Sequence, residues 1–501
     1  MLQAAQEFWN RRDFDAYFQT MERASKLDPA NHHILLDLGL AYGMRYEYAA
    51  AEQRLEKAAR VAPNRAEALV MAGTHCRNFN QYEMATRFFE RAVEQRHVTP
   101  DTLIKLAELY ERLRQLDKAR ELVERALHLD VRCPLAWLVR ARLDRLAGRL
   151  AEAEKALRPL LADPSQDTWS TRIRGWYELG AILDRQERYD EAMAAFLEAK
   201  ALIRPNASQF SQAQQSVHLQ LKQASADITD DVLQCWFDAA NYFEPIRRFA
   251  LLCGHPRSGT TLLEQVLDAH PEIVSSEETP IFFETYLTLK RGAPEDARIL
   301  SILDSAAPIE LQQARDDYFR FTQALLGKLI GNRLLVDKNP SLTTLVPAVI
   351  RVFPETKFIV ALRDPRDVCL SFFMQPLPLN ISSVSYLTLE GTAEEYAALM
   401  GFWQTMAPRM RNPHIEVRYE DMVKDLENVL RKVLEFLGVP WDARVLRFDE
   451  HAAQKLVRSP TYADVTKPVS QGAVGRWRNY QKYLEPLLPR LEPFVKAFGY
   501  E

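Results

Sequence analysis

Small residues recur along the first half of the chain at a fixed interval of about 34 residues, the distance from Ala24 to Ala58. Three series share this interval, and one step in each is longer than the others, with the extra residues falling at 164–168. The series are Ala24, Ala58, Ala92, Ala126, Leu160 and Ala199; Gly39, Gly73, Ala107, Ala141 and Gly180; and Ala51, Ala85, Ala119, Ala153 and Ala192. Residues seven apart, such as Ala51 and Ala58, share one face of a helix, where small side chains let a neighbouring helix approach closely. The pattern predicts a stack of helices built from one repeated unit.

The second half of the chain has a different pattern, in which short apolar runs alternate with helical stretches. Apolar runs occur at 249–253, 273–274, 333–336, 357–362 and 414–418, and each is followed by polar residues and a helical stretch. This alternation predicts an α/β domain with a mostly parallel sheet covered by helices on both faces. Because the carboxyl ends of parallel strands meet at one edge of a sheet, we expect the polar clusters to form a single site.

Composition and charge narrow the class of protein. The chain has 501 residues, of which 47% are hydrophobic and 26% charged, and its formal net charge is −4. These values are typical of globular domains and argue against a disordered chain and a strongly basic nucleic-acid binder. The five cysteines form no CxxC pair, which indicates a reducing compartment and no zinc site. Residues 1–9 lack the pattern of a signal peptide and no apolar run is long enough to span a membrane, so we expect a cytoplasmic protein.

Two antiparallel helices in each interval of about 34 residues resemble the tetratricopeptide repeat. The resemblance implies an all-α solenoid of about six repeats over residues 1–205. Capping and linker helices are expected at 206–246, followed by an α/β P-loop domain at 247–501. Solenoids of this kind usually offer a concave surface to a peptide or protein, which is the partner that we expect. An irregular helical bundle packed through its alanines is the alternative.

The polar cluster after the first apolar run has the spacing of a phosphate-binding loop. In Gly254-xxxx-Gly259-Thr260 the glycines allow the backbone to curl, so that amides at a helix N-terminus point at an anion. A nucleotide kinase or ATPase would have lysine after the second glycine, but that position is Thr260 and the nearby cation is Arg257. The run ending at Asp337 imitates the strand that holds Mg²⁺ in those enzymes. A P-loop kinase or nucleotide hydrolase, and a glycine turn without a ligand, are therefore alternatives.

Two segments resemble the cofactor-binding motifs of sulfotransferases that use 3′-phosphoadenylyl sulfate (PAPS). Residues 255–271 resemble the loop for the 5′-phosphosulfate, and residues 363–371 resemble the motif for the 3′-phosphate. The resemblance covers about residues 248–480 and is closest to protein-tyrosine sulfotransferases and bacterial sulfotransferases fused to tetratricopeptide repeats. It implies in-line transfer of the sulfuryl group of PAPS, without a metal, to a hydroxyl of a protein tyrosine, a glycan or a small molecule. A non-catalytic repeat scaffold is the remaining alternative.

The resemblance also implies roles for individual residues. Those implied in catalysis are Arg257, Glu278, Lys338 and Thr461. Those implied in PAPS binding are Arg257, Ser258, Gly259, Thr260, Thr261, Arg363, Ser371, Tyr419 and Arg476. Glu278 matches the general base, whereas Glu277 beside it is expected to point elsewhere, and Lys338 matches the residue that stabilises the transferring group. The segment 461–469 is expected to close over the cofactor.

Two positions depart from the pattern of tyrosine sulfotransferases. Pro280 replaces an arginine that helps to recognise the substrate, and Gln375 replaces a second arginine for the 3′-phosphate. The first departure weakens the case for tyrosine as the acceptor, and the second implies a somewhat different anchoring of the cofactor.

Overall fold

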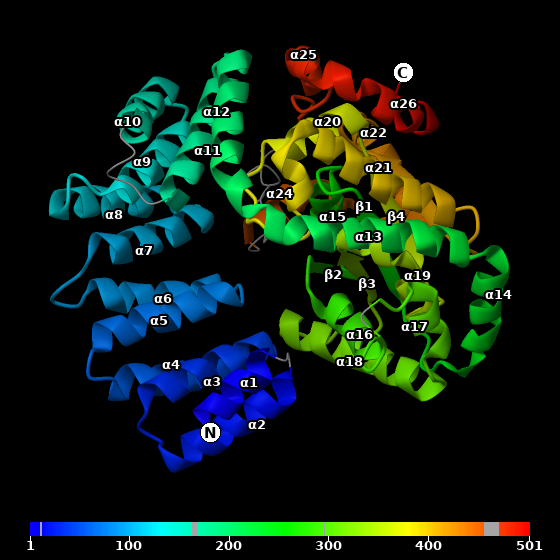
Figure 1. The fold of residues 1–501 in the computed structure, drawn as a ribbon, viewed down its shortest axis with the longest axis horizontal. Helices are drawn as coiled ribbons and strands as arrows, with labels where there is room; N and C mark the ends of the chain where they lie inside the picture. Colours follow the sequence, from blue (N-terminus) through cyan, green and yellow to red (C-terminus); the bar gives the residue numbers. More distant parts are fainter. Residues whose placement is uncertain (11–12, 163–168, 295, 455–469, 501) are drawn as a thin grey trace. The chain divides into compact units, whose positions relative to one another are not determined.

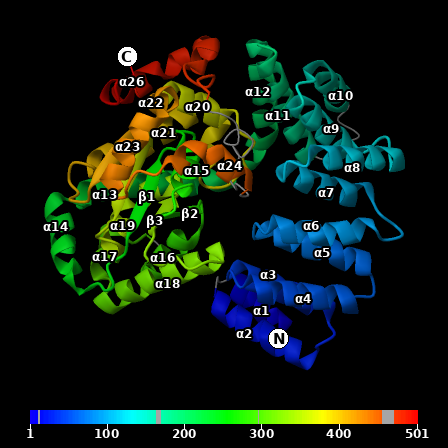
Figure 2. The same ribbon diagram turned by 180° about the vertical axis from the view of Figure 1, so that it is seen from behind.

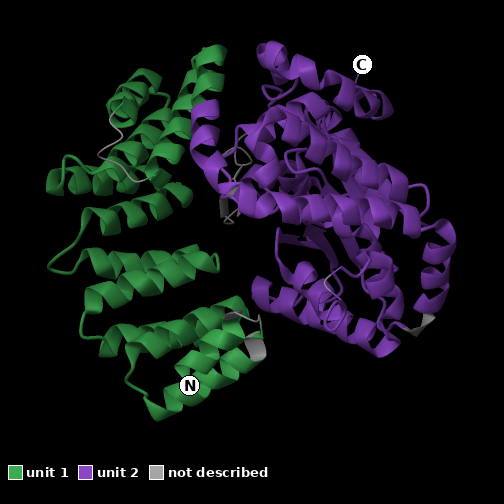
Figure 3. Cartoon of the chain, in the orientation of Figure 1, with its two compact units in different colours: residues 1–195 green, residues 196–501 purple. Residues whose placement is uncertain are grey.

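The computed structural model describes residues 1–10, 13–162, 169–294, 296–454 and 470–500. The chain divides into two compact units, residues 1–195 and 196–501 (Figure 3). This division assigns residues 206–246 to the second unit, together with the α/β domain. The domain limits expected from the sequence stay a prediction.

Antiparallel helix pairs make up the first unit, and the last helix of the last pair continues into the second unit (Figure 1). The pairs are α1 (Leu2–Asn10) and α2 (Phe14–Leu27), α3 (His32–Met44) and α4 (Tyr48–Val61), α5 (Arg65–Asn78) and α6 (Tyr82–Val93), α7 (Pro100–Arg112) and α8 (Leu116–Leu129), α9 (Pro134–Leu146) and α10 (Leu150–Ala162), and α11 (Trp169–Arg185) and α12 (Tyr189–Ile203). The paired-helix repeat predicted from the small-residue series is confirmed.

The turns within the helix pairs repeat with the interval of the sequence. Each of five turns has one residue in the left-handed backbone region, with φ between 60° and 78°: Tyr46, Asn80, Arg114, Gly148 and Glu187. The first four members are evenly spaced, and the last step is longer, as it is in the small-residue series. Each turn closes with a backbone hydrogen bond of 2.8–3.0 Å from the following amide to a carbonyl five residues earlier, the Schellman arrangement that ends many helices.

Small residues are required where the helices cross. The alanines of the series that begins at Ala51 are all fully buried. A Cβ atom on Gly39 would lie 2.4 Å from Leu55 Cδ2, and one on Gly73 would lie 2.7 Å from the Phe89 ring. Larger side chains at these positions would force the helices apart, because protein interiors are close-packed.

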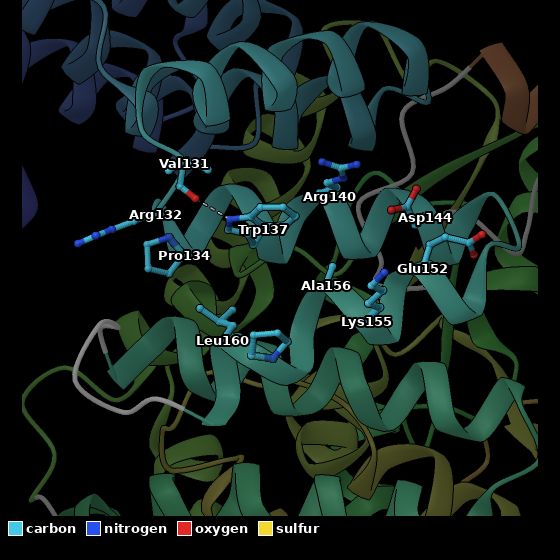
Figure 4. Close-up of a pocket in the computed structure, with 11 residues that line it drawn as sticks. Val131, Arg132, Pro134, Trp137, Arg140, Asp144, Glu152, Lys155, Ala156 and Leu160 are labelled. Carbon is cyan, nitrogen blue, oxygen red and sulfur yellow. Dashed lines mark hydrogen bonds between the residues drawn. The ribbon is translucent and has the colours of Figure 1, made fainter.

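One pocket of the first unit, of about 640 Å³, lies against α9 and α10 (Figure 4). The Trp137 indole lines it, donating a hydrogen bond of 2.8 Å to the Val131 carbonyl, and Arg140 lies over the Trp137 ring. Every residue that lines this pocket belongs to the first unit, so the strand-end clusters of the second unit do not contribute to it.

A parallel sheet forms the centre of the second unit. Its strands in the described residues are β1 (Phe249–Gly254), β2 (Ile273–Glu277), β3 (Leu334–Lys338), β4 (Lys357–Leu362) and β5 (His414–Arg418), in the order β2-β3-β1-β4-β5. All pairings are parallel, with Leu252 opposite Lys338 and Gly254 opposite Ala361. The five apolar runs of the sequence correspond to these strands, and the predicted α/β fold is confirmed.

Helices cover both faces of the sheet (Figure 2). The α-helices that lie entirely within this unit, in the described residues, are α13 (Ser208–Asp227), α14 (Asp230–Asp238), α15 (Thr260–Asp268), α16 (Ile281–Leu289), α17 (Ile299–Ser305), α18 (Pro308–Leu326), α19 (Val346–Val352), α20 (Pro365–Phe373), α21 (Leu389–Met406), α22 (Tyr419–Lys424), α23 (Leu426–Leu437), α24 (Phe448–Gln454), α25 (Gln481–Leu484) and α26 (Leu488–Ala497). Successive residues of β1 face opposite layers: Leu252 belongs to the core with α15 and α23, whereas the Phe249 ring lies 5.6 Å from Tyr318 of α18. The carboxyl ends of the strands lie at an edge of the sheet, between the two layers of helices.

Candidate active site

The polar clusters that follow the strands meet at the carboxyl edge of the sheet. The central strand β1 leads into the glycine loop, residues 254–259, and neighbouring strands end at Lys338 and Leu362. The order of the strands changes direction around β1, which pairs with β3 on one side and β4 on the other. In open parallel sheets this is where ligands usually bind.

Three backbone positions fix the shape of the glycine loop. Gly254 has φ +113°, and a Cβ atom there would lie 2.4 Å from the Ala361 carbonyl oxygen of β4. Gly259 has φ +88°, and a Cβ atom there would lie 2.6 Å from the Tyr419 ring. Arg257 also has a positive φ, +73°, which is unfavourable for a residue with a side chain and is often found at functional sites. Glycine is therefore required at both ends of the loop.

The loop ends at the N-terminus of α15. Among the described residues, no side chain caps this helix, whose N-cap is Gly259. Ser258, Thr260 and Thr261 are all buried there, and the Ser258 amide closes the turn on the His255 carbonyl at 3.2 Å. The positive end of the helix dipole and the first-turn amides favour an anion at this position.

Arginines join the glycine loop to α20. Arg257 Nε donates a hydrogen bond of 3.1 Å to Ser371 Oγ on α20. Arg363, which follows β4, donates from Nη1 to the Arg257 carbonyl at 3.2 Å and lies 5.0 Å from the centre of the Tyr419 ring. Arg363 is 8% exposed, and its Nε has no hydrogen-bond partner in the described part of the chain. Arg257, Ser371, Arg363, Tyr419 and Gly259, all expected to bind cofactor, are thus neighbours in space.

A lysine and two glutamates form the second group at this edge. Lys338 is fully buried, and its Nζ donates to Glu278 Oε1 at 2.6 Å and lies 3.4 Å from Glu277 Oε1. The expectation that Glu277 points elsewhere was wrong. Successive side chains of a regular strand point to opposite faces, but Glu278 has φ +46°, and this left-handed residue breaks the alternation. Both carboxylates consequently face the same ammonium group.

The charges of this group reinforce the protonated state of the lysine. Burial alone would lower the pKa of Lys338, but the carboxylates of Glu278, Glu277 and Glu264 outweigh it, and the pKa is raised. The Glu278 side chain is 43% exposed, whereas that of Glu277 is 4% exposed. Glu278 is therefore the carboxylate of this pair that solvent or an incoming molecule can reach.

Asp337 faces away from this group and is engaged by hydroxyl groups. Tyr318 donates to its Oδ2 at 2.6 Å and Ser276 to its Oδ1 at 3.1 Å, and burial raises the pKa of Asp337 to about 6. A Mg²⁺-holding aspartate needs an ionised oxygen that the ion can reach, whereas Asp337 is fully buried and each of its oxygens accepts a hydrogen bond from a hydroxyl group. This arrangement disfavours the kinase and nucleotide hydrolase alternatives.

Asp367 holds a distant segment beside the arginines. It accepts hydrogen bonds from the amides of Gly475 (2.7 Å) and Trp477 (2.8 Å), so Arg476 lies next to α20, where its Nη2 is 3.7 Å from Met374 Sδ. Sequence reasoning did not single out Asp367, although it ends the Arg-Asp-Pro-Arg-Asp cluster that follows β4. Thr461 and the expected closing segment 461–469 lie outside the described residues.

His255, the residue after Gly254, packs in a buried aromatic layer. Its ring lies 5.6 Å from that of Phe372 and 5.0 Å from that of Tyr396, and burial lowers its pKa to about 4. It is therefore neutral at physiological pH, and its contact with Phe372 is a second link between the loop and α20.

The residues that the structure describes contain neither a cluster of metal ligands nor a membrane-spanning helix. They contain no cluster of three or more histidine, cysteine or acidic residues that could hold a metal ion. They also contain no helix long and apolar enough to cross a membrane.

A glycine loop after a central parallel strand, opening onto an uncapped helix N-terminus, defines an α/β domain suited to phosphate-bearing ligands. Comparison with known families is more specific: residues 250–443 match the sulfotransferase family, and residues 100–143 and 173–206 match tetratricopeptide repeats. The chain therefore contains tetratricopeptide repeats, followed along the sequence by a domain of the sulfotransferase family.

Individual relatives are distant. The chain is 23% identical over 369 residues to an uncharacterized protein of Aquifex aeolicus (strain VF5), covering 69% of this chain and 44% of that protein. It is 27% identical over 236 residues to protein-tyrosine sulfotransferase 1 of Danio rerio, covering 45% of this chain and 64% of that protein. A solved structure, the sulfotransferase domain of the Synechococcus PCC 7002 olefin synthase, is 21% identical with a TM-score of 0.35, over 51% of this chain and 96% of that one. The match spans less than two thirds of each of the two relatives.

Proposed function

We propose that this protein transfers the sulfuryl group of PAPS to a hydroxyl acceptor. The observation that carries the proposal is the juxtaposition of two anion sites, one at the N-terminus of α15 and the other at Arg363 and Ser371, linked by the Arg257–Ser371 hydrogen bond. A nucleotide with anionic groups at two positions of its ribose matches such a pair. Together with the sulfotransferase-family match, this favours PAPS.

The residues present fit this co-substrate. The amides of Ser258 to Thr261, with Arg257, would bind the 5′-phosphosulfate, as the uncapped helix N-terminus suggests. Arg363 and Ser371 would bind the 3′-phosphate, for which the Nε of the buried Arg363 guanidinium, without a hydrogen-bond partner among the described residues, is a suitable donor. Tyr419 packs on the loop and Arg476 lies beside α20, which supports a role for both in binding the cofactor.

In the proposed reaction, bound PAPS supplies a sulfuryl group whose bond to the phosphate oxygen breaks as a bond to the acceptor oxygen forms. Lys338 and Arg257 would stabilise the negative charge that builds on the leaving oxygen. Glu278 would accept the proton of the attacking hydroxyl. Positioning and fixed cations account for most of the catalysis in the analogous phosphoryl transfers, and no metal is needed in this scheme.

The contact between Lys338 and Glu278 has a consequence for this mechanism. Lys338 donates a hydrogen bond of 2.6 Å to Glu278, so the proposed base is already paired with a cation before the acceptor arrives. The acceptor hydroxyl must then compete with Lys338 for Glu278, while Glu277 still pairs with the lysine. We therefore assign proton acceptance to Glu278 and a supporting charge to Glu277.

The acceptor in this proposal is a protein tyrosine, a glycan or a small molecule. The relatives named protein-tyrosine sulfotransferases make tyrosine one candidate, but Pro280 at the position of an arginine in that pattern does not favour it.

The five cysteines are free thiols, which supports a reducing, cytoplasmic setting.

The test uses purified full-length protein, cell extract and PAPS labelled with ³⁵S. Label is expected in a protein, glycan or small-molecule fraction, and Glu278→Ala is expected to reduce its rate of appearance by roughly 10²–10⁴-fold. A parallel reaction with Mg²⁺ and labelled ATP addresses the kinase alternative. Transfer from ATP without transfer from PAPS, or no transfer from either, would refute the proposal.

A further inference from the structure

A buried glutamate of the second unit, Glu264 on α15, has no part in the mechanism above. It is 0% exposed, and its neighbours Leu263, Val266 and Leu267 on the same helix belong to the hydrophobic core around β1. A glutamate is almost never fully buried unless its charge is paired, because an isolated carboxylate is very costly to remove from water. The surroundings of Glu264 must therefore compensate its charge.

Two hydrogen bonds hold the Glu264 carboxylate in place. Ser275 on β2 donates from Oγ to Oε1, and Gln265 donates from Nε2 to Oε2. Ser275 is held in turn, because its amide donates to Asp268 Oδ1 at 2.8 Å. All four of these side chains belong to buried residues. The carboxylate consequently has a defined position between α15 and the sheet.

The cation that Glu264 acts on is Lys338. Ser275 and Glu277 are two residues apart on β2, so their side chains share one face of the sheet, and Glu277 pairs in register with Lys338 on β3. Glu264 reaches this face from α15 through Ser275, and its charge contributes to the raised pKa of Lys338. Lys338 is thus surrounded by Glu264, Glu277 and Glu278, of which Glu264 is the carboxylate that belongs to a helix.

The charge around Lys338 changes in the course of the proposed reaction. Glu278 pairs with Lys338 at 2.6 Å before the acceptor arrives, but it becomes neutral when it accepts the proton of the acceptor. Burial then favours loss of the proton from the lysine, at the moment when a cation is needed beside the leaving oxygen. Glu277 and Glu264 keep their charges throughout, and both are buried.

We propose that Glu264 is a positioning residue for sulfuryl transfer, which keeps Lys338 protonated and oriented while Glu278 takes up the proton of the acceptor. Because Glu264 is 0% exposed, it acts through Lys338 and does not touch the acceptor. Of the titratable groups that act on Lys338, Glu277 and Glu278 come from β2 and the residue after it, Glu264 from α15 and Asp337 from β3. The inference rests on the function proposed above.

The test compares the pH dependence of transfer by the full-length wild type and by Glu264→Gln. The rate of ³⁵S transfer from saturating PAPS to cell extract is measured from about pH 6 to pH 10. Glu264→Gln is expected to move the alkaline limb to lower pH by at least about one unit, because a nearby opposite charge typically shifts a pKa by 1–3 units. The KM for PAPS is expected to stay unchanged, since Glu264 does not contact the nucleotide in this proposal.

Two further variants separate charge from structure. Glu272→Gln is the matched control, because it removes the same charge from a side chain that is 47% exposed and 3.7 Å from Arg248, and its alkaline limb is expected to match that of the wild type. Glu264→Asp keeps the charge and should keep the alkaline limb close to that of the wild type. A limb that moves as far in Glu264→Asp or Glu272→Gln as in Glu264→Gln would overturn the proposal.

Glu264→Gln is expected to fold, because Gln265 Oε1 has no hydrogen-bond partner among the described residues and can accept from the new amide if the Gln265 side chain rotates. If it does not fold, Ser275→Ala carries the test. Loss of the hydrogen bond that holds the carboxylate should lower kcat about 3–10-fold, with unchanged affinity for 3′-phosphoadenosine 5′-phosphate, and a kcat equal to that of the wild type contradicts the proposal.

The outcomes also separate this inference from the function on which it rests. If the wild type transfers sulfate from PAPS and the alkaline limb of Glu264→Gln coincides with that of the wild type, the role of Glu264 is wrong and the proposed function stands. If the wild type transfers nothing from PAPS, the proposed function is refuted, and the role of Glu264 with it.

Discussion

A substitution of Arg363 tests the proposed cofactor site by nucleotide binding alone, so the acceptor need not be known. Arg363 is 8% exposed, and its guanidinium donates hydrogen bonds to the Arg257 carbonyl at 3.2 Å and to the Ala473 carbonyl at 2.5 Å, lies against the Tyr419 ring and is 3.9 Å from the Asp367 carboxylate. If it also binds the 3′-phosphate, Arg363→Ala removes charge-assisted hydrogen bonds worth about 1.5–3 kcal/mol. Affinity for 3′-phosphoadenosine 5′-phosphate is then expected to fall roughly 10–150-fold.

The assay is isothermal titration calorimetry with two nucleotides. Adenosine 5′-phosphate lacks the 3′-phosphate, so its affinity is expected to fall by no more than about fivefold, the effect of losing one ordinary hydrogen bond that steadies the loop. Arg363→Lys keeps the charge but loses the planar fork, and is expected to give an intermediate loss. Equal losses for both nucleotides would show that Arg363 supports the loop only, and unchanged affinity would refute the assignment of the 3′-phosphate.

Three further outcomes are expected. Glu278→Gln should lower kcat by roughly 10²–10⁴-fold, whereas Glu277→Gln should lower it less; the reverse order in steady-state transfer assays would exchange their roles. Gly254→Ala should destabilise the protein by about 2–4 kcal/mol in urea unfolding, because its Cβ meets the carbonyl of β4, whereas Gly327→Ala, with nothing within 4 Å, should cost about 1 kcal/mol; equal costs would contradict the steric argument. Burial lowers the pKa of Lys200 to about 7, so the free energy of unfolding of the wild type is expected to rise as the pH rises from about 7 to 10. Any excess stability of Lys200→Met over the wild type should therefore shrink over that range. A difference in melting temperature between the two proteins that does not vary with pH would argue against this.

Much of the fold could be predicted from local patterns. The fixed interval between small residues specified the helix pairs, and its longer last step reappears in the positive-φ residues of the turns, from Gly148 to Glu187. The turn residues themselves gave little signal, since Tyr46, Arg114 and Glu187 share a conformation usually occupied by glycine or asparagine. Their conformation is imposed by the helix-ending hydrogen bonds and the packing of each pair, which depend on neighbouring helices.

The identities of the candidate site residues could be predicted from the sequence, but the contacts between them could not. The motifs placed Arg257 after β1, and Ser371 on the helix after β4, yet their hydrogen bond depends on how α20 packs beside the loop. The role of Asp367 needed the structure, because its partners at 475 and 477 are distant in the sequence.

The sequence by itself determined three things: the helix pairs of the first half, the parallel sheet of the second half, and the set of polar residues at the carboxyl edge of that sheet. These follow from side-chain periodicity and from the fixed geometry of parallel strands. Only the tertiary structure decided that Glu277 and Glu278 face one lysine, because the left-handed backbone at Glu278 is held by contacts with β3, including the hydrogen bond from its amide to the Lys338 carbonyl. Periodicity describes where side chains point in regular elements, and packing between distant segments decides the places where that regularity is broken.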